Sequence, residues 1–305
     1  MTDIAGLTNA LTDIMVNVRD CELEYLGLEK ARYKRMKNID ESRFFELMSK
    51  KKKTYYQAGS PANLIFNTSL LGLKTALLGT VGKDEIGKKY IEKIKNSGIK
   101  SIISECSGNS GICYVLISPD GERTILTDTG VAKEFSFDMN ELKKARILHT
   151  SGYELVTNPD RTLEVVDYAK KINSKISFDL ADPEMIKRQR GSVEQIISKT
   201  DVLFMTEEEA EELTGLEPEK ALKEMSKICP VVALKKGARG SVVRKDNRQY
   251  SIQTYPSKII STCGAGDAYA SGFLFAYLSG LSTKECGNMG SYIASRVCNS
   301  KKSHL

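Results

Sequence analysis

The 305-residue sequence predicts an α/β fold in one large domain, with a mostly parallel sheet covered by helices on both faces. The main observation is that short apolar runs alternate with amphipathic segments through the second half of the chain. Hydrophobic residues make up 41% and charged residues 28% of the chain, which suits a globular protein with a sizeable core. Some early strands do not fit the alternation, and we expect those within residues 13–55 and 100–130 to form a small appended sheet or lid.

The first half of the chain contains elements of both kinds. Ser60 and Pro61 are typical of a helix N-cap and first turn, so a helix is expected from there to Gly72. Pro119-Asp120-Gly121 separates two apolar runs and predicts a hairpin, because proline presets the turn and glycine accepts a positive φ. The other expected elements are one or two strands within 4–18, a strand at 74–78, a helix at 85–97, and hairpin strands at 112–117 and 122–127.

The second half alternates regularly between strands and helices. Such alternation is typical of βαβ units, whose strands lie parallel in one sheet. Asp246-Asn247 is expected to join two further strands, and the chain is expected to be helical from Ala265 onward. The alternating strands are predicted at 147–150, 176–179, 202–205 and 231–235, and the helices at 160–171, 207–214 and 219–228.

Charge and cysteine usage narrow the class of protein. The 45 basic and 39 acidic residues give a net charge of +6 and are interspersed, so we expect no nucleic-acid partner. The seven cysteines are scattered without a C-x-x-C pair, which argues against a zinc site and favours reduced thiols in the cytoplasm. No apolar stretch approaches about 18 residues, so no membrane span is expected. Ser303-His304-Leu305 loosely resembles a peroxisomal signal, for which chance similarity is the alternative.

The most informative segment is STCGAGD, residues 261–267, which follows a strand-like run and opens an apolar helix. The small residues Gly264, Ala265 and Gly266 let the backbone approach a ligand closely. Their N–H groups would lie at a helix N-terminus, where backbone donors lack partners and the helix dipole is positive. The segment therefore predicts an anion site, especially for phosphate.

Asp267 does not fit a loop that only binds phosphate, because a carboxylate repels that anion. It fits a phosphotransferase, in which a carboxylate accepts the proton of an attacking hydroxyl while backbone amides hold the charge on the transferred phosphoryl group. The alternative is that Asp267 only complements the helix dipole in the first turn. The segment alone leaves both interpretations open.

Two separated signatures occur in the order found in one known family. The pattern D-T-x-G-A-G-D is matched by residues 261–267, and a Gly-Gly pair followed by Asn and a distant Gly is matched by AGSPAN (58–63) and LGTVGKDEIG (78–87). In these motifs, and over nearly its whole length, the chain resembles the PfkB/ribokinase family of carbohydrate and nucleoside kinases. The resemblance implies one ribokinase-like domain over residues 1–305, a three-layer αβα sandwich with a mostly parallel central sheet and a small β-sheet lid.

The resemblance also implies roles for single residues. Asp267 matches the catalytic base, and Gly264, Ala265 and Gly266 match the anion hole. Apart from the resemblance, Asp13 would simply end a strand and Asn63 would lie on the polar side of its helix. The residues implied to hold the acceptor are Asn9, Asp13, Gly59, which is also the hinge, and Asn63.

ATP and Mg²⁺ are the cofactors that the resemblance implies. Glu209 matches the glutamate of an N-x-x-E motif that organises magnesium through water, with Thr206 in place of Asn. An acidic first turn is also common in ordinary helices, so the helix from residue 207 could carry Glu209 for that reason alone. The T-x-G-x-x-G nucleotide loop corresponds to residues 235–240, and the implied nucleotide contacts are Lys235, Gly237, Gly240 and Asn288.

Besides Thr206, three positions depart from the family pattern. Ser261 stands where the family has an Asp that helps to bind a monovalent cation, which makes activation by such a cation doubtful. Ala58 replaces the first hinge glycine, which could stiffen domain closure. Lys235 replaces a nucleotide-contacting Thr and would add positive charge beside the triphosphate, with an effect on ATP affinity or donor preference. None of these changes removes the expected base or the amide nest.

The sequence thus predicts an ATP-dependent kinase, monomeric or homodimeric, that phosphorylates a hydroxyl of a small molecule. The segments TNALTDIMV and SPDGERTILTDTG look most like the adenosine-kinase-like branch, so a nucleoside is the first expectation for the acceptor. A sugar such as ribose, fructose or a related ketosugar is the alternative. A second class of function is a catalytically silent sugar- or nucleotide-binding regulator, which the intact Asp267 disfavours.

Overall fold

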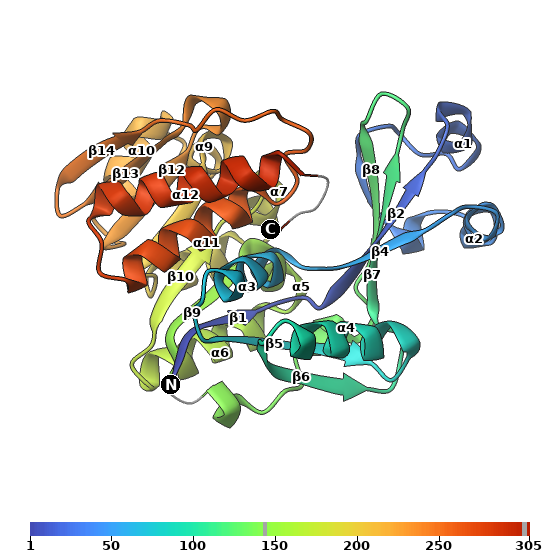
Figure 1. Ribbon diagram of the computed structural model, residues 1–305, viewed down its shortest axis with the longest axis horizontal. Helices are drawn as coiled ribbons and strands as arrows, with labels where there is room; N and C mark the ends of the chain where they lie inside the picture. The colour runs from blue at the N-terminus through green and yellow to red at the C-terminus, as the bar shows by residue number, and fades with distance from the viewer. Residues whose placement is uncertain (143–144, 301–303) are drawn as a thin grey trace.

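A computed structural model describes residues 1–142, 145–300 and 304–305, and these residues form two β-sheets (Figure 1). The larger sheet is mostly parallel, and only the pairs β12–β13 and β13–β14 are antiparallel. Its strand order is β14 (Arg248–Ile252), β13 (Ser241–Lys245), β12 (Val231–Lys235), β11 (Val202–Thr206), β10 (Lys175–Asp179), β9 (Ala145–Ser151), β1 (Thr2–Leu7), β5 (Thr75–Gly82) and β6 (Lys100–Cys106).

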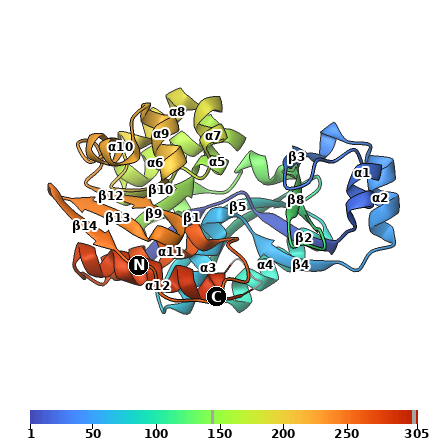
Figure 2. The same ribbon diagram turned by 90° about the horizontal axis from the view of Figure 1, so that it is seen from above.

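Helices cover both faces of the larger sheet, which confirms the expected three-layer arrangement (Figure 2). Each face has its own buried apolar cluster, one containing Phe273 and Tyr90 and the other containing Val165 and Leu222. One face carries α3 (Ser60–Leu70), α4 (Glu85–Asn96), α11 (Ala265–Leu278) and α12 (Thr283–Cys298). The other carries α5 (Gly152–Thr157), α6 (Pro159–Lys171), α7 (Pro183–Arg188), α8 (Arg190–Ile197), α9 (Glu207–Thr214) and α10 (Pro218–Met225).

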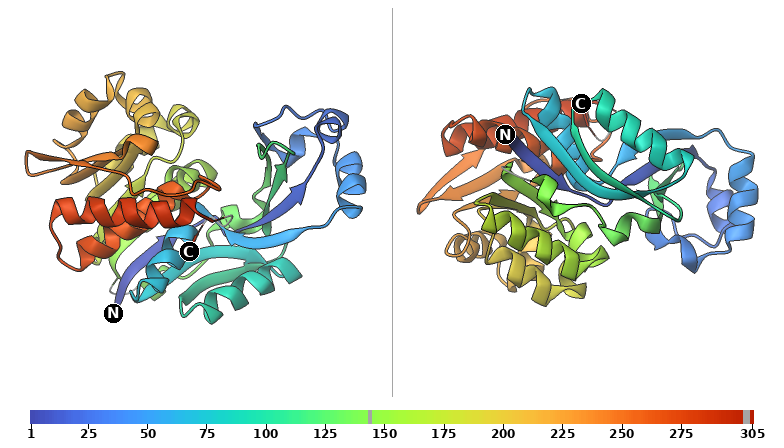
Figure 3. Two further views of the ribbon diagram at one scale, coloured as in Figure 1. Left: turned by 45° about the horizontal axis from the view of Figure 1, so that its top comes forward. Right: turned by 90° about the horizontal axis from the view of Figure 1, so that it is seen from below.

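The smaller sheet, called the lid sheet below, projects from one end of the larger one (Figure 3). Phe44, Met48 and Leu116 are fully buried in an apolar cluster of its own, so this part of the chain has a separate core. Its strand order is β3 (Tyr33–Arg35), β8 (Arg123–Asp128), β7 (Gly111–Ile117), β2 (Leu11–Asn17) and β4 (Thr54–Ala58), with helices α1 (Asp20–Tyr25) and α2 (Glu41–Ser49) beside it.

The apolar run within residues 4–18 forms two strands in two different sheets. β1 lies inside the larger sheet and β2 inside the lid sheet, so Thr8, Asn9 and Ala10 form the junction between them. β7 and β8 form the predicted hairpin of the lid sheet, whereas β6 pairs with β5 at the edge of the larger sheet. One short junction therefore carries the chain from the rigid sheet to the lid sheet.

The local turn and cap signals were mostly confirmed, with one correction. Asp246 and Asn247 both have positive φ between β13 and β14, as a two-residue hairpin loop requires. Ser60 was expected to be the N-cap of α3, but the N-cap is Gly59, and Ser60 is the first helical residue. Five helices of the described chain were not predicted, namely α1, α2, α5, α7 and α8. Among the described residues, no helix is long and apolar enough to cross a membrane.

Asp84 ties the start of α4 to the segment that leads into the lid sheet. Its Oδ1 accepts hydrogen bonds from Gly87 N (2.8 Å) and Ser110 Oγ (2.6 Å), and its Oδ2 accepts one from Ser110 N (2.7 Å). Although partial burial opposes it, these bonds hold the pKa of Asp84 below its ordinary value. The carboxylate therefore stabilises the fold at pH values above the pKa that Asp84 has in the unfolded chain. This stabilisation is lost as the pH falls through the lower pKa that Asp84 has in the folded protein.

We expect Asp84→Ala to lower the free energy of unfolding by about 2–3 kcal/mol at neutral pH, because it removes a helix cap and two further hydrogen bonds to a charge. Urea unfolding measures the change. Asp40→Ala is the matched control, since Asp40 caps α2 through Arg43 N (3.1 Å) and the only other polar contact of its side chain in the described chain is an exposed ion pair with Arg43 Nε (3.3 Å). Because exposed ion pairs contribute little, this variant should cost about 1 kcal/mol or less. Equal losses in the two variants would show that the Ser110 bonds add nothing.

Candidate active site

Asp267 lies in the first turn of α11, and two side chains of α3 hold its carboxylate. Ser60 Oγ donates to Asp267 Oδ1 at 2.6 Å, and Asn63 Nδ2 donates to Asp267 Oδ2 at 2.8 Å. Residues 60 and 267 come from the two sequence signatures, so the fold brings these signatures together. Because each carboxylate oxygen has two lone pairs, one position on each oxygen stays open for another donor.

Burial raises the pKa of Asp267 to about 7, and the hydrogen bonds from Ser60 and Asn63 oppose this rise. The negative charge of Asp179 raises the pKa further, whereas the positive charge of Lys235 lowers it. A carboxyl group with a pKa near neutrality is suited to accept a proton from a hydroxyl group, because it is basic enough and still partly ionised.

The turn before α11 presents backbone donors next to this carboxylate. Among the described residues, no hydrogen-bond partner is found for the N–H groups of Gly264, Gly266 and Asp267. The N–H of Ala265 donates instead to Thr262 O at 3.1 Å. The expected nest of residues 264–266 is therefore displaced, and the open amides are those of residues 264, 266 and 267. Gly264 has φ 74°, a left-handed conformation that favours glycine.

A buried ammonium group lies beside the same turn. Lys235 Nζ forms an ion pair with Asp179 Oδ2 at 2.6 Å, and the two side chains are only 13% and 6% exposed. A Cβ on Gly266 would lie 3.3 Å from Lys235 Nζ, so the ammonium faces the backbone of the α11 turn. Burial opposes it, but the charges of Asp179 and Glu209 hold the pKa of Lys235 above its ordinary value, so it stays cationic.

Glu209 belongs to the capping box of α9. Its Oε2 accepts Thr206 N at 2.8 Å, while Thr206 Oγ1 accepts Glu209 N at 3.3 Å. Burial raises the pKa of Glu209 to about 7, with opposing effects from Lys235 and Asp179. In the part of the chain that the structure describes, no three acidic, histidine or cysteine residues group closely enough to hold a metal ion by themselves. The two carboxylates of Asp179 and Glu209 fit a magnesium ion that is carried mainly by phosphates and water.

Two of the four residues expected to hold the acceptor, Asn9 and Asp13, lie at the junction and in the lid sheet. Asn9 is 4% exposed; its N–H donates to Glu154 Oε1 (2.9 Å) and its Nδ2 to Thr157 Oγ1 (3.1 Å). Its buried Oδ1 has no hydrogen-bond partner in the described chain. Asp13 lies in β2, where burial raises its pKa to about 7 while a hydrogen bond with Cys113 and the charge of Arg123 lower it.

Arg123 connects the lid sheet to the segment before α11. Its Nη2 donates to Ser261 Oγ at 2.8 Å, and the same oxygen accepts Cys263 N at 3.1 Å. Burial raises the pKa of the Cys263 thiol, the charge of Arg123 lowers it, and the charges of Asp13 and Asp267 raise it further. The carboxylates of Asp13 in the lid sheet and Asp267 in α11 therefore both lie near this loop. Ser261, which departs from the family pattern, is therefore hydrogen-bonded to a cationic side chain of the protein.

The remaining expected residues shape the backbone or lie apart from this centre. Gly59 has φ 116°, and a Cβ there would overlap Thr8 Oγ1 and Asn9 O, so only glycine fits between the junction and α3. Gly237 and Gly240 have positive φ at the ends of the 3₁₀ turn η4 (Gly237–Arg239). Asn288 is half-buried on α12. In the described chain, no hydrogen bond joins Gly237, Gly240 or Asn288 to Asp267 or Lys235.

Sequence reasoning missed several side chains of this centre. Asp179 ends β10, and the carboxyl ends of parallel strands are where ligands bind in open α/β sheets, so its position was a usable signal. Ser60 was assigned to capping, and Arg123 was seen only as part of a hairpin. Glu154 accepts both Asn9 N and Ser151 Oγ (2.5 Å), and no sequence pattern indicated it.

Comparisons with known proteins agree with this geometry. The family model of the pfkB family carbohydrate kinases matches residues 35–304. An uncharacterized sugar kinase of Archaeoglobus fulgidus is 28% identical over 75% of this chain and 92% of its own. A nucleoside kinase of Methanothermobacter thermautotrophicus is 28% identical over 78% of this chain and 77% of its own chain. The solved structure of adenosine kinase from Sinorhizobium meliloti superposes with a TM-score of 0.88, covering 100% of this chain and 96% of that one at 24% identity.

The match covers most of the chain and includes both signatures that meet at Asp267. The arrangement is a ribokinase-like α/β fold with a larger, mostly parallel sheet and a smaller one. Members of this family use ATP, usually with Mg²⁺. The chain belongs to the pfkB family of carbohydrate kinases and is a phosphotransferase with an alcohol group as acceptor.

Proposed function

We propose that this kinase transfers the γ-phosphoryl group of ATP to a hydroxyl of a nucleoside, with Asp267 as the base. The observation that carries the proposal is the carboxylate held by Ser60 and Asn63 directly beside the open amides of the α11 turn. The carboxylate accepts the proton of the attacking hydroxyl. The amides of Gly264, Gly266 and Asp267 then stabilise the charge of the phosphoryl group in transfer.

The side chains around this pair have distinct tasks in the proposal. Asn9 and Asp13 orient the acceptor. Asn9 Oδ1, which has no partner in the described chain, accepts a hydrogen bond from one of the acceptor's hydroxyl groups. Lys235 adds a fixed positive charge beside the nucleotide phosphates. Asp179 and Glu209 would hold Mg²⁺ through water, and the ion would neutralise charge between the phosphates when bound. Arg123 fastens the lid sheet to the segment before α11 and so excludes water from the reacting groups.

The acceptor class rests on likeness. The Methanothermobacter relative is named a nucleoside kinase and the superposed Sinorhizobium structure is an adenosine kinase, which supports a nucleoside. The Archaeoglobus relative is named a sugar kinase, and this observation favours a free sugar as the second candidate.

A screen of ADP release from ATP and Mg²⁺ over nucleosides and free sugars tests the acceptor. We expect kcat/KM for the best nucleoside to exceed that of ribose or fructose by at least about tenfold, because a base adds contact area that a free sugar lacks. A free sugar as the best acceptor would replace the first candidate by the second. Binding of these compounds without any turnover would instead identify a silent regulator.

Asp267→Asn is expected to lower kcat by about 10²–10⁴-fold while ATP affinity and the unfolding midpoint stay near those of the wild type, because the amide cannot accept the proton. Single-turnover rates and calorimetric ATP binding measure both quantities. Asp160→Asn is the matched control, since Asp160 is an exposed first-turn residue of α6. If both variants kept full turnover, Asp267 would be only a complement to the helix dipole.

The pH profile of kcat should fall about tenfold per unit below the pKa of about 7 for Asp267 and level off above it, since the base acts only when ionised. Ser60→Ala removes a hydrogen bond to the ionised form, so the acid limb should move up by about one pH unit. Ser69→Ala on the same helix, whose hydroxyl donates to Ser97 O at 3.0 Å, should leave the limb in place. An unmoved limb in Ser60→Ala would remove Asp267 as the titrating group.

A further inference from the structure

A cavity lies at the amino ends of the parallel strands of the larger sheet, at the opposite end of these strands from Asp179 and Lys235. It has a volume of about 330 Å³ and is bounded by the beginnings of β9, β10 and β12, the end of β13, and the turn between α11 and α12. Asp179 and Lys235, by contrast, stand at the carboxyl ends of β10 and β12. Asp267 lies in the first turn of α11, and Tyr277 and Leu278 end the helix 10 and 11 residues later, which is about 15–17 Å along the helix. The cavity is therefore not part of the catalytic centre.

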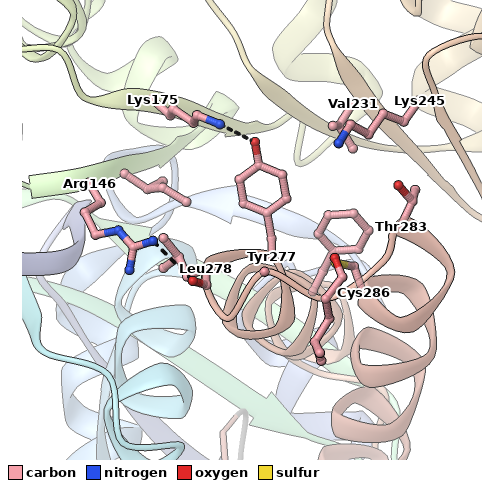
Figure 4. A pocket seen from close by; sticks show the side chains of 12 residues that line it. Arg146, Lys175, Val231, Lys245, Tyr277, Leu278, Thr283 and Cys286 are labelled. Atoms are coloured by element: carbon pink, nitrogen blue, oxygen red, sulfur yellow. Dashed lines mark hydrogen bonds between the residues drawn. The ribbon is translucent and has the colours of Figure 1, made fainter.

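Among the described residues, the lining of this cavity contains three cations and no carboxylate. Arg146, Lys175 and Lys245 come from three different strands (Figure 4). Arg146 forms an ion pair with Asp3 at 3.3 Å and donates to Leu278 O at 3.2 Å. In the described chain, neither the Lys175 nor the Lys245 ammonium group forms an ion pair with a carboxylate. The Lys245 ammonium group has no hydrogen bond to the described residues either. Two positive charges therefore remain without an acidic partner around one concave space.

Tyr277 adds a directed donor between these two lysines. Lys175 Nζ donates to Tyr277 Oη at 2.6 Å, and Figure 4 shows Tyr277 standing between Lys175 and Lys245. Because the phenol oxygen is used as an acceptor, its own proton is available to donate to a ligand. The Leu278 carbonyl, which would repel an anion at the end of α11, is covered by Arg146. The polar groups facing the cavity are thus mostly donors.

We propose that this cavity is a binding site for a small phosphate-bearing anion, separate from the catalytic centre. The phosphate oxygens accept hydrogen bonds from Lys175, Lys245 and the Tyr277 hydroxyl, while Ile147, Val231 and Phe273 line the apolar part. A volume of about 330 Å³ lies at the lower end of the range for small-molecule sites. Inorganic phosphate and a phosphomonoester share this chemistry, and a phosphomonoester also uses the apolar wall.

Calorimetric titration with inorganic phosphate at constant ionic strength tests the site. The protein is first saturated with Mg²⁺ and a non-hydrolysable ATP analogue, so that the open amides before α11 are occupied. We expect saturable binding of one phosphate per chain, and about tenfold or more weaker binding in Lys245→Met and in Lys175→Met, since each loses a charge-assisted hydrogen bond. Tyr277→Phe should weaken binding about twofold to tenfold. Repeating the titration with butyl phosphate, whose alkyl chain can contact the apolar wall, distinguishes a phosphomonoester, which should bind more tightly, from free phosphate.

Lys284→Met is the matched control, because Lys284 is exposed in the first turn of α12 and does not line the cavity. It removes the same charge close by and should change the affinity less than about twofold. No saturable binding, or equal weakening in Lys284→Met and Lys245→Met, would overturn the proposal. Thermal unfolding of each variant confirms that it is folded. The outcome does not depend on the proposed acceptor, because phosphotransfer is not measured.

Discussion

The centre depends on two hydrogen bonds that cross from α3 to the first turn of α11. Ser60 and Asn63 fix both oxygens of Asp267, so the direction of this carboxylate is set by the start of α3. The start of α3 is in turn set by Gly59, which fits against Thr8 and Asn9 only because it has no Cβ. The junction between the two sheets, the proposed acceptor residue Asn9 and the proposed base Asp267 are therefore held by one continuous set of contacts. A displacement of that junction would move the base as well.

Lys235 explains how several carboxyl groups can stand close together at the ends of the strands. Asp179, Glu209 and Asp267 all act on its ammonium group, and in its absence their mutual repulsion would favour protonation. The ion pair with Asp179 is buried, and such pairs contribute little net stability because desolvation offsets the attraction. The Lys235 ammonium group acts instead through its charge. A fixed cation beside the α11 turn attracts anions such as phosphate and lowers the pKa of Asp267. A lysine at the position where the family resemblance implies a threonine thus adds a positive charge beside the α11 turn.

The sequence predicted the layers of the fold and the residues at the start of α11, because strand–helix alternation and a small-residue turn are local patterns. It could not predict that Ser60 would bond to Asp267 instead of capping α3, since that choice depends on a helix 207 residues away in the chain. The same limit applies to Arg123 and Ser261, which meet only when the lid sheet lies against the α11 turn. The open amides were expected at residues 264–266, whereas in the described chain they are those of 264, 266 and 267. Whether the Ala265 amide bonds to Thr262 is a detail of turn geometry that the sequence does not show.

The choice between a nucleoside and a sugar depends on the lid sheet more than on the larger sheet. On the side of the larger sheet, the buried Asn9 Oδ1 has no donor within the part of the chain that the structure describes, and leaving such an atom unpaired costs about 1–3 kcal/mol. A hydroxyl of the acceptor removes this cost, which favours a polyhydroxylated ring over a simple alcohol. A ribose attached to a base and a free sugar both supply that hydroxyl, so Asn9 cannot separate them. Asp13 and Arg123 lie on strands of the lid sheet, and discrimination must therefore come from the side chains that this sheet places around the rest of the acceptor.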